Sequence, residues 1–162
     1  MKFKVLPEPA SVETVAETQA AVPLVPDREV SCCARLVDRT DVGAQDAAKE
    51  WLTFLRALEL VEEVDGRYRR LPHEADPGRL RRSFRERVYL ADDALAVLAA
   101  ADGPVGVEAV FERLADRIPR WERLRHADDD GVWRERLRRT LEWAVVLGLA
   151  ERADDGYVPV RP

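Results

Sequence analysis

Apolar residues recur with a helical period along most of this chain, most clearly over residues 44–58. One stripe there consists of Ala44, Ala48, Trp51, Leu52, Leu55 and Leu58. Intervals of three and four residues place such side chains on one face of an α-helix, and the opposite positions are polar. The pattern therefore predicts an amphipathic helix with a solvated outer face.

Shorter segments with the same period predict further helices. They span residues 11–22, 27–39, 79–89, 94–102, 105–118 and 132–147, and a short helix followed by a loop is expected over 119–131. The inward face of the second helix is expected to consist of Val30, Cys33, Ala34 and Val37. Asp92 or Asp93 is expected to cap the helix over residues 94–102, because an aspartate accepts hydrogen bonds from free amides of the first turn.

Two short stretches predict β-hairpins. Asp65-Gly66 separates two β-capable runs at about residues 61–70, and a second Asp-Gly pair lies within residues 150–159. Asp-Gly between such runs favours a tight turn between antiparallel strands.

The chain also repeats itself, since residues 52–68 match residues 141–157. The matching pairs, each 89 positions apart, are Leu52 and Leu141, Phe54 and Trp143, Leu58 and Leu147, Leu60 and Leu149, and Tyr68 and Tyr157. Each copy reads as a long helix, a Leu-x-Leu exit, a strand, a turn and a return strand with a tyrosine. One structural unit is therefore expected twice.

Three helices followed by a hairpin resemble the winged helix, a variant of the helix-turn-helix. Residues 94–118 resemble the first two helices of winged-helix regulators, with Gly103-Pro104-Val105 as a short strand. The chain is also similar to tandem winged-helix proteins of salt-adapted archaea. The resemblance implies a mainly α fold with small β-hairpin wings, built as two tandem winged-helix units over residues 1–75 and 91–162. The Arg-rich segment 76–90 is expected to form a connecting helix that packs between them.

Composition limits the function. The chain has 23 Arg but 3 Lys, no Asn and one Ile, which is typical of a GC-rich genome, and its net charge is −5. A nucleic-acid site on an acidic protein must be a local patch. No apolar run reaches the roughly 18 residues of a membrane span, and the first residues lack the apolar stretch of a signal peptide. We therefore expect a cytoplasmic, prokaryotic protein with no membrane partner.

The leading hypothesis is a DNA-binding protein that regulates transcription, with double-stranded DNA as its partner. The resemblance implies that the third helix of the first unit enters the major groove, with the hairpin on the backbone and Tyr68 anchoring the strand. The candidate contacts are Gln45, Lys49, Thr53, Arg56, Arg67, Arg69 and Arg70, with Arg134 and Arg138 on the second unit. Segment 67–89 has eight Arg against three acidic residues, a local balance of +5.

The alternative is a protein-interaction scaffold, and a homodimer or another protein partner stays open. The two hypotheses differ in where the arginines lie. One exposed face that joins Arg56, Arg67, Arg69 and Arg70 to Lys49 favours DNA. Internal pairing of these arginines with Glu62, Glu63 and Glu74 favours the scaffold.

No catalytic motif is present: the sequence has no nucleophile elbow, phosphate-binding loop, Rossmann glycines or HExxH. Cys32 and Cys33 lack the spacing of a metal site, and one of them is expected to point inward as a small apolar residue. We therefore expect no enzyme activity, no cofactor and no metal.

Overall fold

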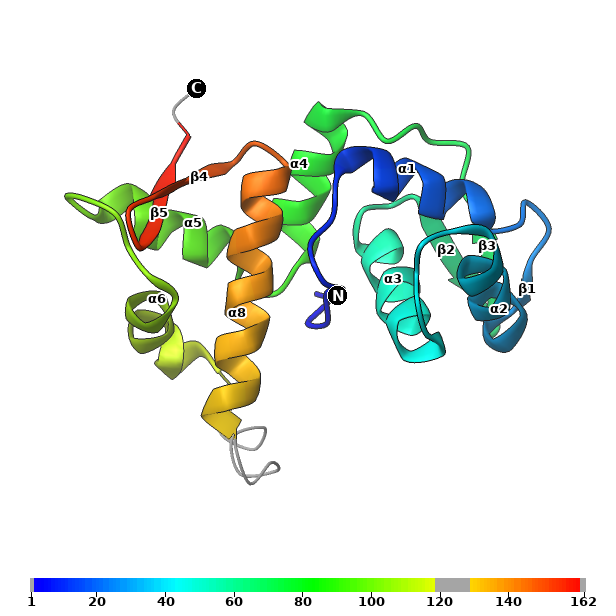
Figure 1. The fold of residues 1–162 in the computed structure, drawn as a ribbon, viewed down its shortest axis with the longest axis horizontal. Helices are drawn as coiled ribbons and strands as arrows, with labels where there is room; N and C mark the ends of the chain where they lie inside the picture. The colour runs from blue at the N-terminus through cyan, green and yellow to red at the C-terminus, as the bar shows by residue number, and fades with distance from the viewer. Residues whose placement is uncertain (1, 119–128, 161–162) are drawn as a thin grey trace. The chain divides into compact units, whose positions relative to one another are not determined.

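The computed structural model describes residues 2–118 and 129–160. The chain divides into two compact units, Met1–Val88 and Tyr89–Pro162. It is mainly helical with two small antiparallel sheets, as the sequence predicts (Figure 1). That the Arg-rich segment 76–90 connects the two units and packs between them stays a prediction.

The first unit combines helices with a three-stranded sheet. Its elements are α1 (Val12–Ala21), β1 (Asp27–Arg28), α2 (Glu29–Arg39), α3 (Gln45–Ala57), β2 (Val61–Val64), β3 (Arg67–Arg70) and α4 (Pro77–Arg87). Strands β2 and β3 form the expected hairpin, with Val61 opposite Arg70 and Val64 opposite Arg67. Asp65 and Gly66 turn the chain with positive φ angles of 53° and 79°.

Strand β1 has no signal in the sequence because it is only two residues long. Asp27 pairs with Tyr68 and Arg28 with Arg67, so the sheet order is β1-β3-β2. Figure 1 shows this sheet beside α1, α2 and α3.

The predicted inward face of α2 is wrong for three of its four residues, since only Cys33 is buried. The buried residues are Cys32, Cys33 and Leu36, whereas Ala34 is exposed and Val30 and Val37 are 64% and 38% exposed. The helix begins directly after β1, and β1 pairs with β3, so sheet pairing sets the rotation of the helix. Both Cys32 and Cys33 are buried, whereas one inward cysteine was expected.

The starts of two helices are capped in different ways. Ser11 accepts a hydrogen bond from the amide of Thr14 at 3.1 Å and caps α1. The prediction of an aspartate cap on α5 (Ala91–Ala100) is wrong, because the cap residue is Leu90 in the left-handed region, with φ 66°. The helix starts earlier than expected, and Asp92 and Asp93 lie within its first turn. There the positive end of the helix dipole stabilises their carboxylates.

The second unit has the same order of elements. After α5 come α6 (Val107–Leu114), the short 3-10 helix η1 (Ala115–Arg117), α8 (Asp129–Val146), β4 (Ala150–Ala153) and β5 (Gly156–Pro159). The predicted strand at 103–105 is reduced to a single bridge in which Val105 and Tyr157 exchange two backbone hydrogen bonds of 3.0 and 2.9 Å. The expectation for residues 119–131 lies mostly outside the described residues.

The repeat is confirmed down to individual hydrogen bonds. Tyr68 and Tyr157 are both buried on the return strand of their hairpins, and each hydroxyl donates to a glutamate. The carbonyl of Leu60 accepts from the amide of Leu71 at 3.0 Å, and that of Leu149 accepts from Val160 at 3.2 Å. Leu71 and Val160, like Leu60 and Leu149, are 89 residues apart.

Apolar side chains fill each unit. On α3 the predicted stripe is buried except for Ala44, which is exposed because it lies before the helix as its N-cap, and Phe54 is buried although it was not in the stripe. Leu55 and Leu58 are fully buried in the first unit, as are Leu141 and Trp143 of α8 in the second. Burying one such side chain stabilises the folded state by roughly 1.5–3 kcal/mol. The polar side chains of α3 are consequently left on its outer face.

Candidate nucleic-acid interface

The outer face of α3 is polar and accessible. Gln45, Asp46 and Lys49 are exposed, and Thr53 and Arg56 are half-buried. The hydroxyl of Thr53 donates to the carbonyl of Lys49 at 3.1 Å. This face therefore presents an amide, an ammonium group and a carboxylate to solvent.

The hairpin distributes its arginines over two faces. Successive strand residues point to opposite sides, and residues opposite each other across a ladder share a side. Arg67 and Arg69 lie with Val64 and Glu62 on the outer side, whereas Arg70 lies on the same side as the buried Tyr68. The structure therefore does not bring Arg70 into one exposed face with Arg67 and Arg69.

Two of the proposed DNA-contacting arginines are paired with glutamates of β2. A guanidinium nitrogen of Arg56 lies 3.7 Å from the carboxylate of Glu63, and the Nε of Arg69 donates to Glu62. The guanidinium of Arg56 also lies 6.0 Å from the centre of the Tyr68 ring. By the criterion of internal pairing, these two contacts favour the scaffold hypothesis.

The other three cationic side chains among the proposed contacts of the first unit are not neutralised by ion pairs with described residues. The described residues include no ion-pair partner for Lys49, Arg67 or Arg70. Lys49 and Arg67 are exposed, whereas Arg70 lines a separate hollow of about 340 Å³ with Gln19 and Leu24. The Nε of Arg70 is buried there without a hydrogen-bond partner.

Tyr68 anchors the hairpin, as the sequence predicts. Its hydroxyl donates to Glu29 of α2 at 3.1 Å. Burial, and then the nearby carboxylates of Glu63 and Glu29, raise the pKa of Tyr68. The phenol is therefore a neutral donor that ties the return strand to α2.

The two arginines proposed in the second unit are bound within that unit. Arg134 donates to Glu108 of α6 through two hydrogen bonds of 2.6 and 2.9 Å. Arg138 donates to Glu135 through two of 2.8 and 2.7 Å. Hydrogen bonds from Arg138, opposed by desolvation and reinforced by Arg139, lower the pKa of Glu135 to about 2. Arg134 thus joins α8 to α6, and Arg138 is neutralised on its own helix.

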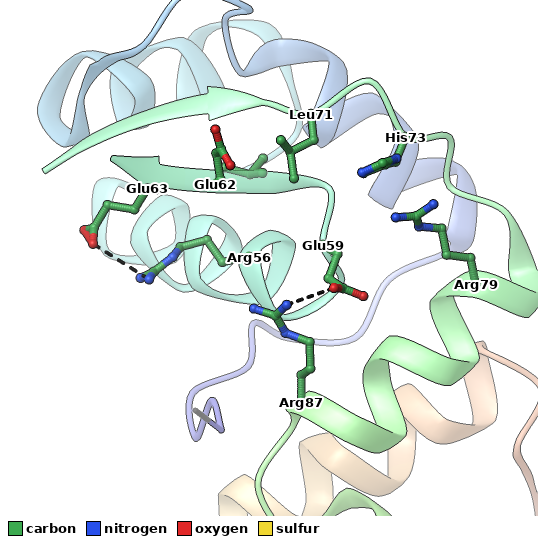
Figure 2. Close-up of a pocket in the computed structure, with 9 residues that line it drawn as sticks. Arg56, Glu59, Glu62, Glu63, Leu71, His73, Arg79 and Arg87 are labelled. Carbon is green, nitrogen blue, oxygen red and sulfur yellow. Dashed lines mark hydrogen bonds and ion pairs between the residues drawn. The ribbon is translucent and has the colours of Figure 1, made fainter. Parts of the chain in front are cut away.

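Sequence reasoning missed a pocket of about 360 Å³ on the first unit. Its lining residues are Arg56, Glu59, Val61, Glu62, Glu63, Leu71, His73, Arg79 and Arg87 (Figure 2). No regular spacing could reveal it, because α3, β2, the segment after β3 and α4 all contribute. The one available signal was the excess of arginine over residues 67–89.

Two further findings limit the chemistry. Within the described residues, no group of three or more His, Cys, Asp or Glu side chains is placed to hold a metal ion. In the same part of the chain, no helix has the length and apolar character needed to cross a membrane.

Each unit is a set of helices followed by a β-hairpin. The second strand of the hairpin also pairs with a short segment before it in sequence, which is β1 in the first unit and Val105 in the second. This arrangement defines a tandem winged-helix protein. The chain belongs to the halobacterial double winged helix domain family, whose family model matches residues 1–161. No curated protein and no solved structure matches it.

Proposed function

We propose that the first unit binds double-stranded DNA, with α3 in the major groove and the hairpin against the backbone, and that the protein regulates transcription. The observation that carries the proposal is the exposed polar face of α3, with Gln45 and Lys49, in a winged-helix unit. Helix-turn-helix proteins place the equivalent helix in the major groove, which is wide enough for an α-helix.

The side chains suit two kinds of contact. The amides of glutamine match the edge of adenine, and the hydroxyl of threonine suits several bases, so Gln45 and Thr53 are proposed to face base edges. Lys49 and Arg67 are proposed to contact phosphates, which position the protein without reading sequence. Arg56 and Arg69 contribute only if they exchange their glutamates for phosphates. Arg134 and Arg138 are proposed as contacts of the second unit on the same condition.

This role is one of binding, and it requires no reaction and no cofactor. It assigns the protein to the cytoplasm of a prokaryotic cell, where the DNA lies. Asp46, Glu62 and Glu63 repel phosphates, so we expect moderate affinity that depends strongly on salt.

The test is the salt dependence of binding to a labelled random duplex, measured by fluorescence anisotropy. Two phosphate contacts, from Lys49 and Arg67, predict a slope of about −2 in a plot of log K against log salt. Absence of binding at about 50 mM salt, where phosphate contacts are strongest, contradicts the proposal. Selection from a random duplex pool then identifies the preferred sequence.

A second candidate is a docking function, which two observations favour. Arg56 and Arg69 are paired internally, and Val30, Ala34 and Val37 form an exposed apolar stripe on α2. The flanking Glu29 and Asp38 suit a partner helix with an apolar face and basic edges. This candidate predicts no duplex binding at low salt. It also predicts that Val30→Asp releases a partner, once that partner is identified by co-purification.

A further inference from the structure

The pocket of the first unit lies where four segments meet. Arg56 and Glu59 come from α3 and its exit, Glu62 and Glu63 from β2, His73 from the segment after β3, and Arg79 and Arg87 from α4. Figure 2 shows Glu59, His73, Arg79 and Arg87 around one part of this hollow, whereas Arg56 is turned toward Glu63. Its volume of about 360 Å³ falls within the range of small-molecule sites, roughly 300–1,000 Å³.

Each of the three glutamates around this hollow already has a cation. Glu63 pairs with Arg56 at 3.7 Å, and Glu62 accepts from Arg69. Glu59 accepts from Arg87 at 3.0 Å and from the hydroxyl of Ser83 at 2.6 Å. The hydrogen bond from Ser83, followed by the charge of Arg87, lowers the pKa of Glu59. The negative charge of the lining is therefore neutralised by specific partners.

Arg79 has no such direct partner, although its positive charge also helps to lower the pKa of Glu59. Among the described residues it has no carboxylate at ion-pair distance, and its Nε is buried without a hydrogen-bond acceptor. Figure 2 shows its guanidinium beside the imidazole of His73, which has no side-chain hydrogen bond in the described part of the chain. The Nε of Arg87 is also buried and unpaired. Buried donors without acceptors are rare in native proteins, and a bound ion is one recognised explanation for them.

The rest of the lining is held in position. The guanidinium groups of Arg56 and Arg87 lie 5.2 and 5.4 Å from the centre of the Phe3 ring. The amide of Phe3 donates to the carbonyl of Arg87 at 2.7 Å, so the N-terminal segment is tied to α4. Two of the three arginines are thus fixed by stacking and ion pairs before any ligand arrives.

We infer that this pocket binds a small molecule with a phosphate or carboxylate group, which Arg79 contacts directly and His73 contacts from the facing wall. A guanidinium offers parallel N–H donors that match the oxygens of either group. An oxyanion at this position supplies the acceptor that Arg79 lacks. Because neither Arg79 nor His73 is among the proposed DNA contacts, the inference does not depend on whether the first unit binds DNA.

The experiment titrates the ¹⁵N-labelled full chain with sodium phosphate and, separately, with sodium acetate, at constant ionic strength. The signals followed are the side-chain Nε–Hε resonance of Arg79 and the imidazole resonances of His73. We expect saturable shifts of these signals with at least one anion. Arg79→Gln is expected to weaken binding by about tenfold or more, since it removes a charge-assisted contact.

The matched control is Arg82→Gln, which removes the same charge from an exposed position of the same helix. It is expected to change the affinity by less than about twofold, because a distant exposed charge is screened by salt. His73→Asn is the second variant, and it is expected to weaken binding several-fold even if Arg79→Gln perturbs folding. Non-saturable shifts with both anions overturn the inference, as does equal weakening by Arg79→Gln and Arg82→Gln.

Discussion

Glu59 and Gly148 occupy the same position in the two units, 89 residues apart, and both have left-handed backbones with φ of 62° and 80°. Each lies two residues past the end of a long helix, α3 or α8. In both units the next amide, of Leu60 or Leu149, bonds to a carbonyl five residues earlier, at 2.9 and 2.8 Å. This helix ending normally has glycine at the left-handed position. Glu59 therefore bears a conformational cost that its bonds to Ser83 and Arg87 offset.

We expect Glu59→Gly to be more stable than Glu59→Ala by about 1 kcal/mol. Both variants lose the same side-chain hydrogen bonds, so they differ mainly in the strain of a Cβ at positive φ. Gly148→Ala introduces that strain in the second unit and is expected to lose about 1 kcal/mol relative to the wild type. Urea unfolding measures all three, and equal stability of Glu59→Gly and Glu59→Ala contradicts the assignment of strain.

Gly156 is required where β5 passes Val105. A Cβ at this position would lie 2.8 Å from the carbonyl carbon of Val105, closer than such atoms approach in proteins. We expect Gly156→Ala to destabilise the second unit by about 1–3 kcal/mol, because the backbone must shift. Gly103→Ala is the control, since a Cβ there meets nothing within 4 Å. A thermal unfolding midpoint equal for both variants is the contrary result.

Glu135 is expected to make the stability of the second unit depend on pH. Its pKa falls from the ordinary 4.5 to about 2 in the folded protein, so protons bind the unfolded state more readily. The stabilisation is present above about pH 4.5 and is lost as the pH falls toward about 2. Urea midpoints at a series of pH values should show Glu135→Gln less stable than the wild type near neutrality, with the difference shrinking in acid.

Glu112→Gln provides the comparison for this pH series. Glu112 is exposed on α6, so its replacement is expected to leave the acid profile of the wild type unchanged. A difference between wild type and Glu135→Gln that stays constant from neutrality to acid would show that the Arg138 and Arg139 pairs do not set the profile.

The two cysteines are expected to resist thiol reagents in the folded protein. Burial, and then the nearby Asp27 carboxylate, raise the pKa of Cys32 to about 11, and burial also raises that of Cys33. Only a thiolate reacts rapidly, so at pH 8 labelling should proceed no faster than unfolding. A colourimetric thiol assay should count two groups in denaturant and none promptly without it. Prompt labelling of either cysteine in the native protein contradicts this.

Lys49 gives the sharpest test of the proposed DNA contact. Lys49→Gln should weaken duplex binding and reduce the steepness of the salt dependence by about 1, the value for one phosphate contact. Arg39→Gln removes an exposed charge from the end of α2 and is expected to leave the slope unchanged. Equal effects of the two variants would indicate a general charge effect instead of a contact.

Much of the fold was readable because its signals are local. The stripe on α3 and the Asp65-Gly66 turn each depend on a few neighbouring residues, and the structure confirms the turn and the stripe apart from Ala44. The failures lie where distant segments decide. The period of α2 indicated Val30 and Val37 as inward, but pairing of β1 with β3 rotated the helix and buried Leu36 instead.

For the candidate site, the sequence by itself determined the residue types and their order: a polar face on α3, an arginine-bearing hairpin and a second copy 89 residues later. Only the tertiary structure decided which arginines meet glutamates. Arg56 reaches Glu63 and Arg87 reaches Glu59, while Arg79 lies beside His73 (Figure 2) and forms no ion pair with any described residue. The physical reason is that periodicity reports how a segment orients its own side chains, whereas an ion pair between elements depends on how those elements pack.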